Sequence, residues 1–431
     1  MATRGQLVAL LIGAAFATPI AAQQTIEQRV QQLEKRLDDL SRQMGEVRTQ
    51  LDQLKGQPPP AAAEDLTKIG TVEQQPASAP APTPLTDVQT INNVQNPGAS
   101  KVFNPDISVI GNFLGKAGQP NPIEFGRDGA RPPMELDEAE VAFQAFVDPY
   151  AKANFFLSLT PQGIDVEEGY ANFVTLPYDL TAKVGKMKAY FGKDNTWHTH
   201  VRPWVDQPLV IHNLFGGDEG LNDTGVSVSK VFPNPWNLYL EATGEAFKGD
   251  VANVFQRRSL NELFYNAHLK GFRDISENSN IEVGTSYAHG ALAGASTGTN
   301  QFAGLDVTYR WRPLMQGLYS SFIGRLEAVT NNRSDLEHHL KGFYVSADRQ
   351  FARRWFAGVR FDSSDRPVAG EQSTLRFTDR GASATVTFWP SEFSQLRGQL
   401  RRTRYGDIGK SVNEFLVQLQ FSIGAHGAHT F

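Results

Sequence analysis

The stretch AGLDVTYRW (residues 303–311) separates its side chains into an apolar set and a polar set. The apolar set has one parity and comprises Ala303, Leu305, Val307, Tyr309 and Trp311, and the other comprises Gly304, Asp306, Thr308 and Arg310. Because side chains on a strand point alternately to opposite faces, the stretch predicts a strand with one apolar and one polar face. The polar face is the surface in a soluble sandwich, but it lines the interior in a membrane barrel, whose apolar face contacts lipid.

The same alternation recurs along residues 101–431, for example at 139–147, 153–159 and 415–423. The sequence accommodates about sixteen such strands. Their predicted centres lie near residues 110, 141, 155, 171, 185, 227, 241, 267, 284, 307, 325, 345, 358, 384, 398 and 418. Roughly 21 residues for each strand and its connection suit the tilted strands of a membrane barrel.

The predicted connections alternate in length. Tight links fall at 148–150, 176–178, 232–236, 311–313, 349–355 and 388–393, whereas the links at 116–133, 192–223, 248–260, 331–340 and 363–374 are longer. The tight links carry the aromatic residues Tyr150, Tyr178, Phe232, Trp236, Trp311, Trp355, Phe388, Trp389 and Phe393. Short turns with aromatic residues at one rim and long loops at the other are typical of outer-membrane barrels.

We therefore predict an all-β fold, a transmembrane antiparallel β-barrel of about 16 strands spanning residues 101–431. In this barrel Leu305, Val307 and Tyr309 contact lipid, whereas Asp306 and Thr308 face a water-filled lumen together with Arg310. About sixteen strands enclose an aqueous channel, whereas eight leave an interior that side chains can fill.

Residues 1–22 have the pattern of a signal peptide, with Arg4 before an apolar run at 7–17 and small residues at Ala21 and Ala22. No other apolar run reaches the roughly 18 residues of a membrane-spanning helix, and only a closed barrel satisfies the backbone of strands in lipid. The expected location is the bacterial outer membrane. The chain has no cysteine, which excludes disulfides, thiolate metal sites and thiol nucleophiles.

Residues 24–55 carry a heptad pattern without a slip, formed by Ile26, Val30, Leu33, Leu37, Leu40, Met44, Val47, Leu51 and Leu54. This pattern predicts a periplasmic coiled coil that joins copies of the chain, as a dimer or a trimer. A lone amphipathic helix is the less favoured alternative, because the spacing never slips. The Pro- and Ala-rich residues 56–100 predict a disordered, extended linker between the coiled coil and the barrel.

The formal net charge of −5 excludes a basic nucleic-acid binder. The charge is uneven, with 16 basic and 24 acidic residues in 101–300 against 17 and 12 in 301–431. Charged side chains on the wall of a pore set its ion preference. The expected pore-lining residues are Lys152, Glu138, Glu140, Asp306, Arg310, Arg325, Arg360, Arg397 and Arg401. The alternative for each is a solvated lining residue without a selective role.

The longest predicted loop, 192–223, contains the sequence TWHTHVRPW (196–204). A loop this aromatic is expected to fold into the barrel and to narrow the pore with Trp197, His198, His200, Arg202 and Trp204. His198, His200 and His212 could together bind zinc or copper, but one two-residue spacing is a weak signal. Ordinary packing is favoured, so neither a metal nor a cofactor is expected. No motif nominates a nucleophile or an acid–base pair, so no enzyme activity is expected.

The segment VEEGYANFVTLPYDLTAKVGKMKAYFG (166–192) resembles the phosphate-selective porin O/P family, in which an acidic strand, a proline turn and a basic strand precede an inward-folded third loop. The segment EFLVQLQFSIG (414–424) is similar to the closing strand of that family. The resemblance implies a trimeric sixteen-stranded porin with basic residues along an anion path. Lys183, Lys186 and Lys188 match the basic strand, and Arg202 falls in the constriction loop.

These features together predict an outer-membrane porin for passive diffusion of small hydrophilic solutes or ions. Its expected partners are outer-membrane lipid, copies of itself in a homotrimer, and the permeating ions or solutes, without nucleic acid. The alternative is a structural tether, in which the coiled coil or linker binds peptidoglycan and the barrel is only an anchor. An active-uptake receptor would need a folded plug domain, which the low-complexity linker cannot supply.

Overall fold

The computed structural model describes residue 42 and residues 105–119, 133–368, 374–407 and 409–424. The predicted signal peptide, coiled coil and linker lie outside the described residues, apart from Arg42, so they stay predictions. Among the helices of the described residues, none combines the length and the hydropathy that crossing a bilayer requires.

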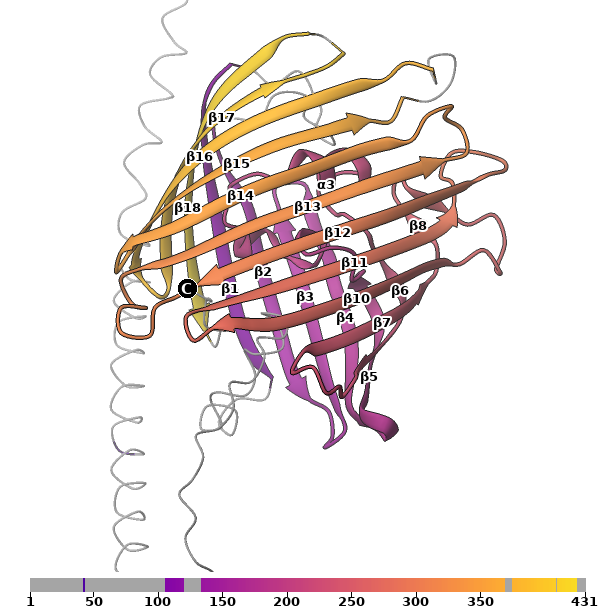
Figure 1. Cartoon of the computed structure of the whole chain (residues 1–431), viewed down its shortest axis with the longest axis horizontal. Coiled ribbons are helices and arrows are strands. Elements are labelled where there is room, and N and C mark those ends of the chain that lie inside the picture. Colours follow the sequence, from indigo (N-terminus) through magenta and orange to yellow (C-terminus); the bar gives the residue numbers. More distant parts are fainter. Residues whose placement is uncertain (1–41, 43–104, 120–132, 369–373, 408, 425–431) are drawn as a thin grey trace, which may run out of the picture. The chain divides into compact units, whose positions relative to one another are not determined.

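The described residues of the barrel form a closed antiparallel sheet of sixteen strands, each paired with its neighbours along the chain, and β1 pairs with β18 to close it (Figure 1). The strands are β1 (Asp106–Gly118), β2 (Met134–Phe146), β3 (Ala151–Thr160), β4 (Gly163–Leu176), β5 (Leu180–Lys188), β6 (Asn222–Val231), β7 (Tyr239–Phe247), β10 (Phe264–Ser276), β11 (Ser279–Ala291), β12 (Thr299–Trp311), β13 (Ser321–Arg333), β14 (Leu340–Ala352), β15 (Trp355–Arg366), β16 (Phe377–Ser391), β17 (Ser394–Arg404) and β18 (Ser411–Gly424). The short strands β8 (Asp250–Val251) and β9 (Phe255–Gln256) pair separately in the β7–β10 connection. Every predicted strand centre lies within a barrel strand, which confirms the fold and the strand number.

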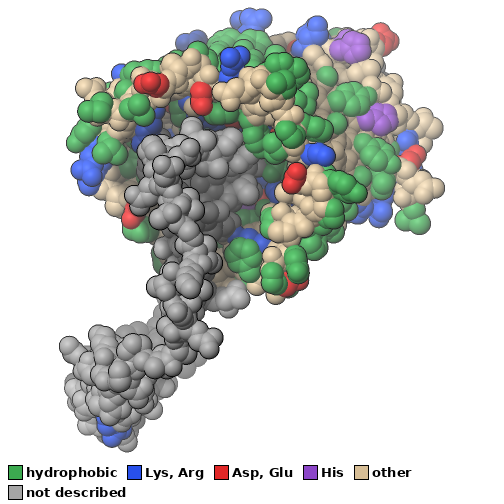
Figure 2. All heavy atoms as spheres, turned by 60° about the horizontal axis from the view of Figure 1, so that its bottom comes forward, with side chains coloured by type: hydrophobic (Ala, Val, Ile, Leu, Met, Phe, Trp, Pro, Cys, Tyr) green, Lys and Arg blue, Asp and Glu red, His purple; other side chains and the backbone are tan. Residues whose placement is uncertain are grey.

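Most apolar side chains of the described strands lie on the outside of the barrel, and most polar side chains lie on its inside. On β12, Leu305 is 42% exposed, whereas Asp306 is 4% and Thr308 is 2% exposed. On β18, Phe415 and Leu419 are likewise exposed while Gln418 is buried. Figure 2 shows hydrophobic side chains over much of the visible described surface. This inversion of the soluble pattern is expected where the outer face contacts lipid.

The two rims of the barrel differ in the length of their connections, largely as predicted. At one rim β10–β11, β14–β15 and β16–β17 are joined by the residue pairs 277–278, 353–354 and 392–393, and β4–β5 by the 3-10 helix η1 (Pro177–Asp179). At the other rim the β5–β6 loop runs from 189 to 221 and the β7–β10 connection from 248 to 263. Two links depart from the pattern, because β12–β13 uses residues 312–320 and β3–β4 only residues 161–162.

Aromatic residues lie at the rim with the short turns. Tyr150, Tyr178 and Trp236 are exposed there, and Trp355 stacks on Phe388 with ring centroids 4.5 Å apart. Such rings combine an apolar body with a polar tip and prefer the level of the lipid headgroups. The rim with the short turns therefore has the composition of a membrane interface.

Candidate functional site: the loop between β5 and β6

The loop of residues 189–221 folds against the inner wall of the barrel. It contains the 3-10 helices η2 (Asp194–Thr196) and η3 (Thr199–Val201) and the short helix α3 (Leu209–Leu214), which packs against β13–β16. Of the predicted constriction residues, Trp197, His198, Arg202 and Trp204 are buried, and His200 is partly buried. The side chains that hold the loop face inward and belong to strands far apart around the barrel.

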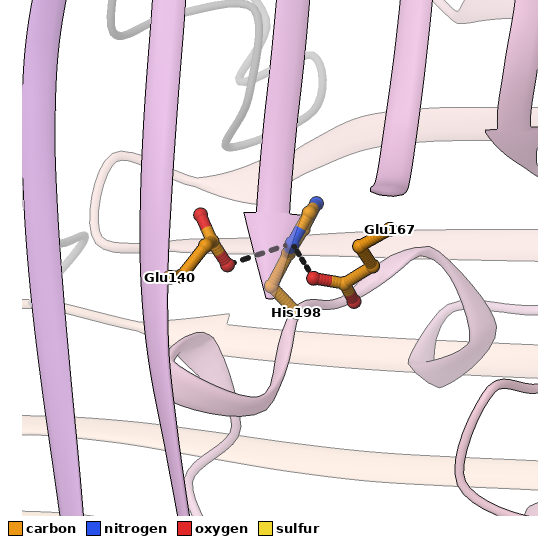
Figure 3. A group of neighbouring side chains, drawn as sticks. All are labelled: Glu140, Glu167 and His198. Carbon is orange, nitrogen blue, oxygen red and sulfur yellow. Dashed lines mark hydrogen bonds and ion pairs between the residues drawn. The ribbon is translucent and has the colours of Figure 1, made fainter. Parts of the chain in front are cut away.

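One attachment of the loop, which we name the histidine anchor, consists of His198, Glu140, Glu167 and Glu168. The Nδ1 atom of His198 lies 2.9 Å from Glu140 Oε2 and 2.9 Å from Glu167 Oε2, and its Nε2 atom lies 2.8 Å from Glu168 Oε2. Figure 3 shows the imidazole between the side chains of Glu140 and Glu167. Burial alone would lower the pKa of His198, but the carboxylates of Glu167 and Glu140 outweigh it and raise that pKa well above the ordinary value. The anchor thus ties the loop to β2 and β4.

A β-bulge in β4 explains how two consecutive glutamates reach the same imidazole. The β3–β4 register pairs Phe156 with Glu168 but Leu157 with Val166, so Glu167 is the extra residue of β4. On a regular strand Glu167 and Glu168 would point to opposite faces, whereas a bulge re-aims a side chain locally. Lys188 of β5 adds an ion pair to Glu167 at 2.7 Å and donates a hydrogen bond to the carbonyl oxygen of Trp197 at 3.0 Å.

A second attachment, which we name the aspartate anchor, joins Asp206 to Arg360 of β15 and Arg401 of β17. Both guanidinium groups lie 2.8 Å from Asp206 Oδ2. Although burial alone would raise the pKa of Asp206, Arg360 and Arg401 outweigh it and hold that pKa well below the ordinary value. Arg397, also on β17, donates to the carbonyl oxygens of Arg202 and Trp204 at 2.9 and 3.2 Å.

The first residues of the loop bond to a third part of the wall. The backbone N–H of Gly192 donates to Ser286 Oγ of β11 at 2.9 Å, and that of Asp194 donates to Glu327 Oε2 of β13 at 3.2 Å. Gly192 has a φ of 62°, and a Cβ atom there would collide with the carboxylate of Glu327. Glycine is therefore required where the loop leaves the wall.

Apolar packing fills the space between the loop and one side of the wall. Phe215 lies edge-on to Phe302 of β12 with ring centroids 5.4 Å apart, and Trp204 lies edge-on to Tyr344 of β14 at 5.3 Å. Gly304 of β12 makes room for Phe191, because a Cβ atom there would lie 2.7 Å from the Phe191 ring. Inward-facing aromatic residues of the wall thus form a dry core with the loop.

The structure places the nine predicted pore-lining residues on the inner wall, but several of them hold the loop instead of standing free. Glu140, Arg360, Arg397 and Arg401 belong to the attachments described above. The others pair within the wall or are buried there: Arg310 with Glu282, Arg325 with Asp348, Lys152 with Gln144, and Glu138 and Asp306 among inward-facing neighbours. Of the lysines that match the basic strand of the porin O/P family, Lys186 pairs with the exposed Asp165 at 3.4 Å.

Among the described residues, Glu140, Glu167 and His198 bring metal-ligating atoms within 4.8 Å of one another. The three histidines that the sequence singled out do not meet, because His212 lies 3.4 Å from Asp218 at another part of the loop.

Sequence reasoning missed Glu167 and Glu168 as partners of the loop. The signal was available, since two adjacent glutamates interrupt the alternation of β4.

Comparisons with known proteins are consistent with this fold. No family model matches the chain. The chain is 30% identical over 389 residues to an uncharacterized protein of Aquifex aeolicus (strain VF5), which covers 78% of this chain and 82% of that protein. Among solved structures, it is similar to the loop L8 deletion mutant of OmpT, an outer membrane protein of Vibrio cholerae, with a TM-score of 0.50, 10% identity, and coverage of 74% of this chain and 99% of that one. It is also similar to Pseudomonas putida OprB, with a TM-score of 0.50, 9% identity, and coverage of 74% and 94%.

Proposed function

The chain belongs to the same family as the Aquifex aeolicus protein, and from its structure we propose that it is an outer-membrane porin for passive diffusion of small hydrophilic solutes or ions. The observation that carries the proposal is the orientation of the side chains on the sixteen closed strands, with apolar residues outside and polar residues inside. A soluble protein with this surface would expose a large apolar area to water. A closed barrel of about sixteen strands has room for an aqueous path.

In this proposal the β5–β6 loop is the constriction of the channel. Its support is the position of the two anchors, because the histidine anchor lies on β2 and β4 and the aspartate anchor on β15 and β17. The chain between these anchors includes the predicted constriction residues His200, Arg202 and Trp204. Permeating solutes therefore pass beside a fixed segment of chain.

We also propose that the channel prefers anions, as the resemblance to the phosphate-selective porin O/P family implies. The inner wall supports this at β11, where one carboxylate, that of Glu282, pairs with both Lys193 and Arg310. The side chains of these two bases are each 21% exposed, whereas that of Glu282 is 4% exposed. Permeating ions at this level therefore contact the bases more than the acid, and exposed positive groups on a pore wall favour anions.

The predicted coiled coil of residues 24–55 supports self-association of this porin, since its heptad pattern needs partner chains, and the resemblance to the phosphate-selective porin O/P family implies that the assembly is a trimer. In a trimer each chain supplies its own barrel and its own constriction. Openings and closings are then expected in groups of three.

Conductance of the purified full chain in a planar lipid bilayer tests the proposed function. We expect stepwise ion currents and, in a salt gradient, a reversal potential of the sign given by anion preference. Arg310→Gln should move that potential towards zero, because it removes an exposed lumen charge. Arg312→Gln, two residues on in the exposed β12–β13 link, is the matched control and should leave the potential unchanged.

Folded protein that inserts without any current would contradict the channel and leave anchoring as the role of the barrel. A current with cation preference would contradict only the selectivity. An equal shift for Arg310→Gln and Arg312→Gln would exclude the cluster of Glu282, Lys193 and Arg310 as the source of the selectivity.

A further inference from the structure

The histidine anchor contains more hydrogen-bond acceptors than the N–H donors of its imidazole can satisfy. An imidazole offers one N–H at each ring nitrogen, and an ionised carboxylate only accepts. Yet His198 Nδ1 lies 2.9 Å from oxygens of both Glu140 and Glu167, so the two carboxylates share a single proton. The same oxygen of Glu140 lies 3.1 Å from His200 Nδ1, and all of these side chains are largely buried. Three ligand-type atoms, one each from His198, Glu140 and Glu167, thus lie within 4.8 Å of one another around a position that one proton fills incompletely.

We propose that this position binds a divalent transition-metal ion such as Zn²⁺, with His198 Nδ1, Glu140 Oε2 and Glu167 Oε2 as protein ligands and a water molecule as the fourth ligand. Imidazole nitrogens and carboxylate oxygens are the donors that zinc takes in proteins that offer no thiolate, and this chain has no cysteine. The ligands come from β2, the bulge of β4 and the loop. The ion therefore joins the loop to two strands of the wall.

The spacing of the ligand atoms supports a four-coordinate site. Bonds of about 2.0–2.2 Å from zinc to nitrogen and oxygen place tetrahedral ligand atoms roughly 3.3–3.5 Å apart. The distances of 2.9 Å from His198 Nδ1 to Glu140 Oε2 and of 2.9 Å to Glu167 Oε2 fall short of this by a few tenths of an ångström. A small outward movement of the side chains, without a change of backbone, makes room for the ion.

Glu168 supplies the supporting interaction that histidine ligands of zinc usually have. When Nδ1 binds a metal, the proton of the neutral ring is on Nε2, and that atom lies 2.8 Å from Glu168 Oε2. A carboxylate that accepts from the far nitrogen fixes the orientation of a metal-bound histidine and increases its basicity. The bulge at Glu167 thus gives the two adjacent glutamates separate roles, one towards the ion and one behind the ring.

The charge of the surroundings also favours a divalent cation. Glu138 lies on the same inward side of β2 as Glu140, so four carboxylates gather here with Glu167 and Glu168. Lys188 supplies an ammonium group to this cluster, where it pairs with Glu167 at 2.7 Å. Buried carboxylates are costly unless cations compensate them, and a divalent ion adds two positive charges.

Zinc binding by the full chain in detergent micelles tests the site. The protein is treated with a chelator, exposed to Zn²⁺ in the presence of excess Mg²⁺, and analysed for bound metal and for X-ray absorption of the zinc. We expect one tightly bound zinc per chain, with nitrogen and oxygen ligands at about 2.0–2.2 Å. Glu140→Gln and His198→Gln should each weaken binding at least roughly tenfold, as loss of a ligand does.

His212→Gln is the matched control, because it removes a histidine of the same loop that lies outside the anchor. Folding of each variant is verified by circular dichroism, and Glu168→Gln provides a variant that leaves all three proposed protein ligands in place. We expect His212→Gln to bind zinc as the original chain does, and Glu168→Gln to bind it more weakly.

No stoichiometric zinc on the folded chain would overturn the proposal. Equal binding by the original chain and His198→Gln would overturn it as well, and so would equal losses in His198→Gln and His212→Gln. The proposed channel is not at stake in these outcomes, because binding is measured without any current.

Discussion

Replacing Trp204 with alanine is expected to lower the free energy of unfolding by about 3–5 kcal/mol, the usual cost of removing a fully buried tryptophan. Trp204 is 1% exposed, lies edge-on to Tyr344 at 5.3 Å, and carries the guanidinium of Arg360 over its ring at 4.8 Å. Its loss leaves a cavity between the loop and the wall beside the aspartate anchor. Denaturant unfolding of the chain in detergent micelles, followed by circular dichroism, measures the change.

Trp204→Phe is the control for this prediction. It keeps most of the packing and removes the indole N–H, which has no hydrogen-bond partner on the described residues. We therefore expect a much smaller loss for Trp204→Phe than for Trp204→Ala. If the alanine variant unfolds at the same denaturant concentration as the original chain, the loop is not packed against the wall as the structure has it.

Replacing Leu305 with arginine is expected to lower the free energy of unfolding by about 2–4 kcal/mol, because charge near the middle of the lipid-facing band is costly. Leu305 is the midpoint of β12 and points outward. Met315→Arg is the matched control, since Met315 is exposed in the β12–β13 connection, outside the strands. Unfolding in lipid vesicles should separate the two variants.

Equal stability of Leu305→Arg and Met315→Arg would show that the outer face of β12 does not contact hydrocarbon. The comparison requires vesicles, because a detergent micelle adapts more readily to a charged side chain. A loss confined to Leu305→Arg would locate the apolar band at this level of the barrel.

The barrel was predictable from the sequence because its signal is local. Leu305 and Asp306 take their faces from the backbone alternation of one strand, and the same rule repeated along the chain gives the strand number. The short-turn rim was equally accessible, since Pro and aromatic residues mark it in the sequence. Among the described connections, the link at 312–320 is longer than predicted, and the short connection at 161–162 departs from the alternation of short and long links.

The attachments of the loop were not predictable in the same way, because they join residues remote in sequence. Asp206 bonds to Arg401 and His198 to Glu140, and no local pattern states which inward-facing residue the loop will meet. Two features of the barrel interior that the sequence analysis did not predict nevertheless leave a local signal in the sequence. Phe302 shares the parity of Asp306 and so marks an apolar patch inside the barrel, and the adjacent Glu167 and Glu168 mark the bulge.

The orientation of β12 can be measured directly, because the chain contains no cysteine and a single introduced cysteine carries a unique spin label. Labels at residues 305–310 in lipid vesicles report collisions with oxygen, which concentrates in lipid, and with a water-soluble nickel chelate. We predict that positions 305, 307 and 309 favour oxygen and that positions 306, 308 and 310 do not. Preference for the chelate at 305, 307 and 309, or no alternation at all, would contradict a barrel whose apolar face contacts lipid.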